Sequence, residues 1–275
     1  MRLMETNRID TIFADLRPSG RKALMPFITA GDPDLDTTIR LLEAAQDAGA
    51  SICEVGIPFS DPIADGPVIQ ASMSRALDRG LKVDQVFAAI AEARTRLTIG
   101  LVAMVSYSIV HRMGLKNFVT QAKTAGFDGF IFPDLPLAES GPARAVVAEA
   151  GMILSMLIAP TTPIERAEPL AAARTGFVYV VSRPGITGAR EALPPELPAR
   201  LERLRGVTAS PMAVGFGIST AAQVRDVVSV ADAAIVGSAL VAQIYEFAQI
   251  SNDRAVEGTR AAVAELASGL TADAL

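Results

Sequence analysis

The sequence predicts a (β/α)8 barrel, because eight short apolar segments alternate with alanine-rich amphipathic segments along 275 residues. The apolar segments lack polar alternation, which favours strands of a parallel sheet that is covered on both faces. Eight strand–helix pairs fit a barrel of about 250 residues. An open doubly wound sheet is the alternative, but the first turn, at residues 30–33, lacks the glycine fingerprint of such sheets.

The predicted strands are β-branched runs bounded by turn residues. They comprise residues 23–29, 52–57, 99–105, 129–133, 153–158, 177–181, 212–215 and 233–237. Before the first strand, residues 8–16 place apolar side chains at helical spacing, which predicts an extra N-terminal helix that closes the barrel floor. Gly49, Gly126 and Gly151 each stand between a helical segment and a strand, as glycine C-caps do.

Composition limits the class of protein. No linker or low-complexity stretch divides the chain, so we expect one domain over residues 1–275. There is no apolar run of membrane-spanning length and no signal-peptide pattern, which predicts a soluble, cytoplasmic protein. One cysteine excludes an intrachain disulfide, and one histidine leaves too few ligands for a zinc or copper site. A net charge of −5 with mixed signs gives no footprint for nucleic acid.

Two connections are too long for a loop and one helix. They follow the second and sixth strands and include residues 58–67 and 183–198. Long loops in a compact domain are usually functional, and in a barrel both lie at the C-terminal face, where active sites are built. We therefore expect mobile lids over an active site.

Glu54 is a carboxylate inside an otherwise apolar strand. Because side chains alternate along a strand, Glu54 shares the inward face with Ile52 and Gly56, whereas Cys53 packs against the helices. An internal salt bridge is the structural alternative, but no basic residue occupies the inward positions of the neighbouring strands. Desolvation raises a carboxyl pKa, so Glu54 is a candidate for giving and taking a proton near neutrality.

Two more residues belong to this region. Asp65 precedes a glycine, which is ordinary turn chemistry, but its loop follows the strand of Glu54, so a second catalytic carboxylate is plausible. Tyr179 shares one strand face with Phe177 and Val181. It either fills the core or approaches the same space as Glu54.

Glycine clusters follow three successive late strands. They are Gly185-Ile186-Thr187-Gly188, Gly215-Phe216-Gly217-Ile218 and Val236-Gly237-Ser238-Ala239. Glycine allows the backbone to approach an anion, and the N-terminus of a helix supplies free N–H donors. Many barrels hold phosphate after strands seven and eight, so these clusters predict a phosphate-ester ligand.

The motifs together resemble the tryptophan synthase α subunit, in order and across nearly the whole chain. The matching segments are Pro26-Phe27-Ile28-Thr29-Ala30-Gly31-Asp32-Pro33, residues 54–70, Pro133-Asp134-Leu135-Pro136, residues 183–189 and Gly215-Phe216-Gly217-Ile218. The most specific of these is the Pro-Phe-Ser-Asp-Pro run with Ala-Asp-Gly-Pro after it, within residues 58–67. The family is a (β/α)8 barrel that cleaves indole-3-glycerol phosphate into indole and glyceraldehyde 3-phosphate.

The resemblance implies a site. It makes Glu54 the general acid/base and Asp65 the residue that holds the indole N–H. It places other residues around the substrate: Phe27, Ile69 and Ile131 at the indole, Tyr179 beside Glu54, Phe216 at the substrate, the backbone N–H groups of Gly188, Gly217, Gly237 and Ser238 at the phosphate, and Thr187 on the lid after strand six. It also implies a β subunit that contains pyridoxal phosphate and receives the indole, with Pro58 and Asp61 at the contact, and no cofactor in this chain.

One segment departs from the family pattern. After strand three, Ser106 stands in place of a substrate-side tyrosine and Ser108 in place of a partner-side asparagine, while Tyr107 supplies an aromatic ring if the strand end is bulged. Other functions stay open: a stand-alone lyase that releases indole, a barrel that binds a phosphate ester only to regulate a partner, and an isomerase of a phosphorylated sugar.

Overall fold

Eight parallel strands pair in chain order and close into a TIM barrel, with β1 beside both β2 and β8. The computed structural model describes residues 6–62, 65–182 and 193–270. The strands are β1 (Ala23–Thr29), β2 (Ile52–Gly56), β3 (Gly100–Met104), β4 (Gly129–Ile131), β5 (Ile153–Ile158), β6 (Val178–Val181), β7 (Met212–Gly215) and β8 (Ala233–Val236). The predicted fold class is confirmed.

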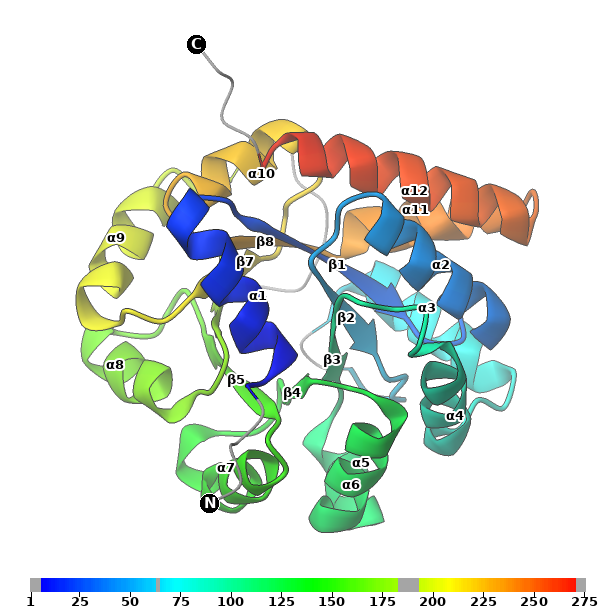
Figure 1. Ribbon diagram of the computed structural model, residues 1–275, viewed down its shortest axis with the longest axis horizontal. Coiled ribbons are helices and arrows are strands. Elements are labelled where there is room, and N and C mark those ends of the chain that lie inside the picture. Colours follow the sequence, from blue (N-terminus) through cyan, green and yellow to red (C-terminus); the bar gives the residue numbers. More distant parts are fainter. Residues whose placement is uncertain (1–5, 63–64, 183–192, 271–275) are drawn as a thin grey trace.

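Helices surround the barrel as an outer ring, as Figure 1 shows. The described residues form α1 (Arg8–Leu16), α2 (Leu35–Asp47), α3 (Pro67–Asp78), α4 (Val83–Ala93), α5 (Tyr107–Met113), α6 (Leu115–Ala125), α7 (Gly141–Glu149), α8 (Ile164–Ala173), α9 (Leu197–Val207), α10 (Ala221–Val228), α11 (Ser238–Ala248) and α12 (Asn252–Ser268). Two short 3-10 helices, Arg17–Ser19 and Leu137–Glu139, follow α1 and precede α7.

The structure corrects the predicted elements in three ways. The connections after β2, β3 and β8 each hold two helices, so one helix per strand was too few. Strands β2, β3, β4, β6 and β8 are one or two residues shorter than predicted, although flanking residues such as Ile57 and Phe132 stay buried. The helix α9 begins at Leu197 and includes Pro198, because proline is tolerated in a first turn, so the predicted loop at 183–198 extended too far.

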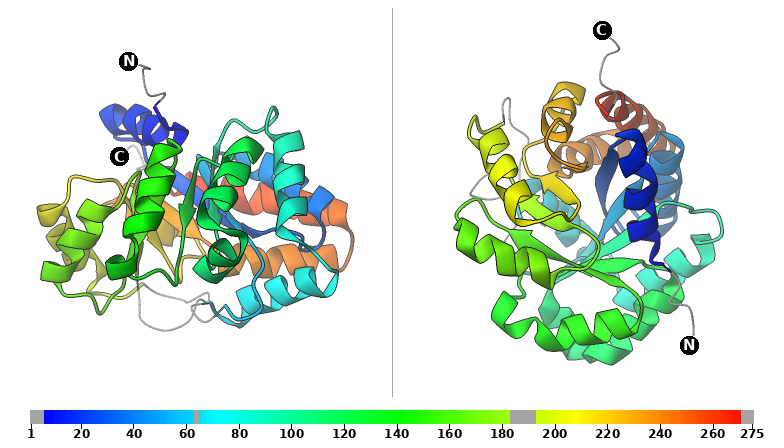
Figure 2. Two further views of the ribbon diagram at one scale, coloured as in Figure 1. Left: turned by 90° about the horizontal axis from the view of Figure 1, so that it is seen from below. Right: turned by 60° about the vertical axis from the view of Figure 1, so that its left-hand side comes forward.

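The predicted N-terminal helix closes one end of the barrel. The Asn7 side chain caps α1 by accepting a hydrogen bond from the Ile9 N–H. Ile9 and Phe13 are buried against the barrel interior, and a Cβ on Gly100 would lie 2.3 Å from the Ile9 side chain. Figure 2 shows α1 at one end of the barrel, outside the ring of the other helices. The prediction of a helix at the floor is confirmed.

Two groups of buried side chains separate the inner and outer faces of the strands. Cys53 and Val55 pack with the helices, whereas Ile52 belongs to the cluster inside the barrel. In the strand register, Glu54 lies beside Phe27 on β1 and Val102 on β3. Glu54 therefore projects into an apolar barrel interior, as strand alternation predicts.

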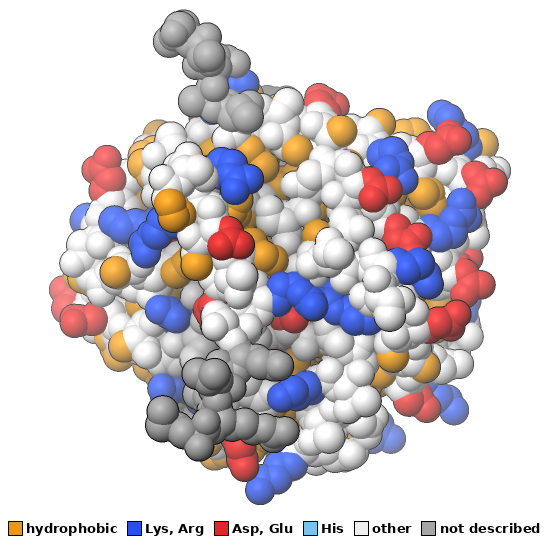
Figure 3. Space-filling view, in the orientation of Figure 1, with side chains coloured by type: hydrophobic (Ala, Val, Ile, Leu, Met, Phe, Trp, Pro, Cys, Tyr) orange, Lys and Arg blue, Asp and Glu red, His pale blue; other side chains and the backbone are white. Residues whose placement is uncertain are grey.

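Charged side chains of both signs are interspersed over the face in Figure 3. No helix in the described part of the chain is long and apolar enough to cross a membrane. Within the same residues, no group of three or more His, Cys, Asp or Glu side chains is placed to hold a metal ion.

Candidate active site

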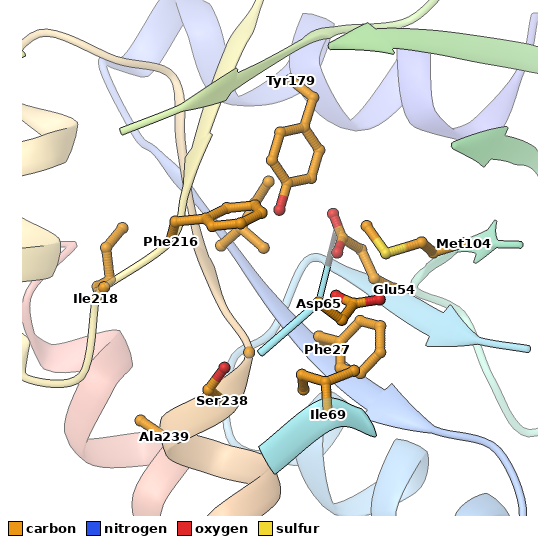
Figure 4. Close-up of a pocket in the computed structure, with 13 residues that line it drawn as sticks. Phe27, Glu54, Asp65, Ile69, Met104, Tyr179, Phe216, Ile218, Ser238 and Ala239 are labelled. Atoms are coloured by element: carbon orange, nitrogen blue, oxygen red, sulfur yellow. The ribbon is translucent and has the colours of Figure 1, made fainter. Parts of the chain in front are cut away.

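A pocket opens at the carboxyl ends of the strands, at the opposite end of the barrel from α1. It is lined by Phe27, Glu54, Asp65, Ile69, Met104, Tyr179, Phe216, Gly217, Ile218, Ile235, Gly237, Ser238 and Ala239. Figure 4 shows these residues arriving from both sides of the barrel, with the two carboxylates near Tyr179 and Ser238 at the start of α11. The pocket is narrow, ≈ 40 Å³, and adjoins a wider cavity of ≈ 440 Å³ that also touches Asp65 and Met104.

Glu54 is buried in the interior of the barrel. Its side chain is 1% exposed, and among the described residues neither carboxylate oxygen has a hydrogen-bond partner. Burial, with a smaller contribution from the charge of Asp65, raises the Glu54 pKa well above its ordinary value. The shift favours the protonated carboxyl group, which can donate a proton. The salt-bridge alternative does not hold within this part of the chain.

Asp65 stands just before α3, which begins with Pro67. Its backbone N–H donates to the Pro62 carbonyl over 3.0 Å, and its own carbonyl accepts from the Gln70 side chain over 2.7 Å. These bonds fix the backbone while the side chain faces the pocket (Figure 4). Burial raises the Asp65 pKa to about 6, so this carboxyl group is mostly ionised above pH 7. Burial thus raises the pKa of both acids.

Two glycines provide the space for the aromatic side chains of the pocket. A Cβ on Gly56 would lie 2.3 Å from the Phe27 ring, and one on Gly215 would lie 2.5 Å from the Tyr179 hydroxyl oxygen. The Tyr179 hydroxyl points toward the Glu54 carboxyl group (Figure 4). Burial, followed by the charges of Glu54 and Asp65, raises the Tyr179 pKa well above its ordinary value, so the phenol stays neutral.

The far end of the pocket has the features of an anion site. The helix α11 begins at Ser238, directly after β8, so its free backbone N–H groups face the strand ends. The Ser238 hydroxyl is buried and has no hydrogen-bond partner among the described residues. Gly237 has a φ of −110°, and a Cβ there would meet only Phe27, at 3.7 Å. Because packing does not require glycine here, its missing side chain leaves room for a ligand.

Most of the predicted site residues come together in this one pocket. Ile131 is fully buried inside the barrel and does not line the pocket. Thr187 and Gly188 lie outside the described residues, as does most of the predicted second lid. Met104 and Ile235 also line the pocket and were not among the predicted site residues, whereas Ile218 and Ala239 belong to the predicted glycine clusters but were assigned no contact. The inward alternation of β3 and β8 could have indicated Met104 and Ile235.

The wider cavity includes the segment that departs from the family pattern. Ser106 and Ser108 line it together with Asp61, and Pro58 lines a neighbouring groove. The Ser106 hydroxyl donates to the Asp134 carboxylate over 2.6 Å. Tyr107 begins α5 and packs on Phe132, at 5.5 Å between ring centroids. Tyr107 therefore supplies no aromatic ring to the pocket, contrary to the bulged alternative.

Comparison with known proteins shows the family of the chain. The family model described as "Tryptophan synthase alpha chain" matches residues 13–271. The chain belongs to this family. The tryptophan synthase alpha chain of Rhodopirellula baltica is 42% identical over 264 residues, 94% of each chain. That of Chloroflexus aggregans is 43% identical over 263 residues, covering 95% of this chain and 97% of the relative.

Solved structures of the tryptophan synthase family show the same fold. A Mycobacterium tuberculosis tryptophan synthase structure is 33% identical with a TM-score of 0.87, and the match covers 97% of this chain and 99% of that one. A chain of the tryptophan synthase complex from Pyrococcus furiosus is 37% identical with a TM-score of 0.82, and the match covers 90% of this chain and 98% of that one.

Proposed function

We propose that this chain, as a tryptophan synthase alpha chain, cleaves indole-3-glycerol phosphate with Glu54 and Asp65 as its catalytic pair. The observation that carries this proposal is the unpartnered, buried carboxyl group of Glu54, which shares one pocket with Asp65 and with the start of α11. The reaction is a retro-aldol lyase step that yields indole and glyceraldehyde 3-phosphate. The chain acts as one barrel domain.

Glu54 takes part in two proton transfers, first as an acid and then as a base. Its neutral carboxyl group first protonates the indole ring carbon that bears the glycerol chain. The resulting carboxylate then takes the proton of the adjacent chain hydroxyl, the carbon–carbon bond breaks, and its electron pair returns to the ring. The hydroxyl-bearing carbon becomes the aldehyde, and Glu54 ends protonated as it began. A raised pKa suits this task, because the group must both donate and accept near neutral pH.

Asp65 acts on the ring nitrogen. Its carboxylate accepts the hydrogen bond of the indole N–H and stabilises the positive charge that develops on the ring after protonation. This division of labour requires one neutral and one ionised acid. The pKa of Asp65, about 6, leaves it mostly ionised above pH 7, and the raised pKa of Glu54 favours its neutral form. Phe27, Ile69 and Phe216 supply apolar surface for the indole.

The phosphate group binds at the backbone of two strand ends. Gly217 on one side, and Gly237 with Ser238 on the other, present N–H groups, and the unpaired Ser238 hydroxyl adds a further donor. No lysine or arginine lines the pocket within the described residues, so neutral donors and the α11 dipole carry the binding. Gly188 and Thr187 contribute from the connection after β6.

The partner is the tryptophan synthase β subunit, which receives the indole. We place Pro58 and Asp61 at the contact and expect a heterotetramer of two α and two β subunits in the cytoplasm. No cofactor is required in this chain, since every step is a proton transfer that carboxyl groups supply. Pyridoxal phosphate belongs to the β partner.

Substitution of Glu54 by Gln tests the proposal. The variant keeps the side-chain size but has no proton to give, so cleavage of indole-3-glycerol phosphate falls by about 10²- to 10⁴-fold. Binding of glycerol 3-phosphate, measured by calorimetry, stays unchanged. The control is Glu43→Gln, which removes an exposed ion pair with Arg96 and leaves turnover intact. Cleavage that survives in E54Q contradicts this mechanism.

Two assays separate the alternative functions. A chain that turns over fully when purified alone is a stand-alone lyase, whereas stimulation by an added β subunit identifies a synthase subunit. A regulatory barrel binds glycerol 3-phosphate but does not cleave the indole substrate with or without the partner. Glu54 argues against a purely regulatory function, because a protein that only binds a ligand gains nothing from a buried acid without a partner among the described residues.

A further inference from the structure

Phe216 has an unusual backbone. Its φ is +80°, and in the described part of the chain it is the only residue other than glycine in the left-handed region. A bulky side chain disfavours this conformation, and such outliers persist only where the surrounding structure holds them. Gly217 follows with the same φ of +80°, so two successive left-handed residues form the turn after β7. The turn lines the pocket with Phe216 and Gly217.

Ser182 holds this turn from the end of β6. Its backbone N–H donates to the Gly215 carbonyl over 3.0 Å, and its hydroxyl donates to the carbonyl of Phe216 itself. The Ser182 side chain is buried, at 4% exposure. One residue therefore binds two successive carbonyls of the turn. The hydroxyl bond is the one that fixes the orientation of the peptide group between Phe216 and Gly217.

The strained conformation has a consequence in the pocket. It turns the Phe216 ring toward Tyr179, with 6.3 Å between ring centroids and an interplanar angle of 83° (Figure 4). With φ negative, the backbone would direct the ring elsewhere and reorient the Gly217 N–H. The pocket wall that Phe216 and Gly217 form therefore depends on the positive φ of Phe216, which a phenylalanine does not favour by itself.

We infer that Ser182 is a positioning residue, whose hydroxyl keeps Phe216 in the binding-competent conformation. The inference rests on the proposed lyase function. Ser182 touches neither the reacting atoms nor the pocket. It acts by setting the fraction of molecules in which the pocket is formed. A lower competent fraction weakens apparent affinity in proportion and leaves the bound complex unchanged.

Kinetics of Ser182→Ala test this role. The KM for indole-3-glycerol phosphate rises by roughly 3- to 10-fold, the ratio that corresponds to one net hydrogen bond, while kcat at saturation stays within about twofold. A purely structural role would instead lower the melting temperature or the active fraction without moving KM. An unchanged KM in a folded S182A protein overturns the inference.

Ser155→Ala is the matched control. Ser155 is also a buried serine of the barrel, and its hydroxyl donates to the carbonyl of Phe177, just before β6, over 2.9 Å. It does not line the pocket. We expect its loss to lower stability while KM stays at the wild-type value. A rise in KM equal to that of S182A would show that the effect is general destabilisation, and it would overturn the inference.

A double-mutant cycle with Phe216→Gly isolates the strain. Glycine adopts a positive φ without cost, so in the F216G background the further effect of S182A on KM is less than about twofold. Equal effects in both backgrounds overturn the inference. If S182A does not fold, Ser182→Cys replaces it, since a thiol keeps the size but donates weakly. A wild-type chain that cleaves no substrate, with or without a β subunit, contradicts the proposed function instead.

Discussion

The hydroxyl of Tyr179 occupies the space that a side chain on Gly215 would need. The two residues lie on neighbouring strands, where Tyr179 is in register with Ala213, two positions before Gly215. A Cβ on Gly215 would lie 2.5 Å from the hydroxyl oxygen and 3.0 Å from the ring carbon that bears it. Because Tyr179 points toward Glu54, the missing side chain on β7 fixes where an active-site phenol stands. The packing of Gly215 against Tyr179 therefore bears on the proposed catalytic site.

Gly215→Ala is therefore expected to impair cleavage. The new methyl group displaces Tyr179 toward Glu54, at a cost of about 1–3 kcal/mol that appears in stability or in kcat/KM. Tyr179→Phe in the same chain removes the closest atom and recovers part of the loss. Steady-state kinetics of the two single variants and the double variant measure the coupling. Additive effects would show that the contact is not the cause.

Much of this site follows from sequence for simple physical reasons. Strand alternation places Glu54 inside the barrel, and glycines at strand ends indicate the phosphate site. The contribution of Ile218 could not be predicted, since it depends on how the β7 turn folds back over the pocket. The left-handed conformation of Phe216 could not be predicted either, because the hydrogen bond from the Ser182 hydroxyl that supports it joins residues 34 positions apart.

The pH dependence of cleavage follows from Asp65. Its pKa of about 6 in the free protein predicts that kcat/KM falls as pH drops through this value, because the protonated acid no longer accepts the indole N–H. Asp65→Asn removes this acidic limb and lowers activity at pH 7.5 by about 10²-fold. Measured pH profiles of both proteins check the assignment. An acidic limb that persists in D65N belongs to another group.

The same pKa shift predicts that Asp65 destabilises the fold at neutral pH. Its folded-state pKa is raised from 3.8 to about 6, so the folded protein binds more protons than the unfolded chain between these values. Stability therefore falls as pH rises through this window, and the full cost is present above it. Asp65→Asn should raise the melting temperature at pH 7.5 by a few degrees, and the difference should shrink toward pH 4. A constant difference across pH would contradict this linkage.

Substitution of Pro58 tests the proposed partner contact. Pro58→Ala adds flexibility to the connection after β2, so docking of the β subunit must order it. We expect weaker stimulation of cleavage by the partner, with a dissociation constant raised by about 3- to 10-fold. Pro163→Ala, at the start of α8, is the control. Equal effects of the two substitutions would remove Pro58 from the interface.

Arg75 and Asp32 form a partly buried ion pair that anchors α3. Asp32 is 5% exposed and accepts two hydrogen bonds from Arg75, over 3.0 and 2.5 Å, while the guanidinium group lies 4.0 Å from the centre of the Tyr245 ring. Since α3 begins two residues after Asp65, at Pro67, and carries Ile69, this anchor also holds one wall of the pocket. Arg79 lies farther away, at 3.5 Å.

Arg75→Ala should lower the free energy of unfolding by about 3 kcal/mol, because it leaves Asp32 buried with only the exposed Arg79 nearby. Arg75→Lys recovers only part of this loss, since an ammonium group neither binds both carboxylate oxygens in a fork nor stacks on Tyr245. The control is Arg40→Ala, which removes an exposed pair with Asp253 and costs at most about 1 kcal/mol. Urea unfolding followed by circular dichroism measures all three variants. Equal losses in the Arg75→Ala and Arg40→Ala variants would show that burial of Asp32 does not set the cost.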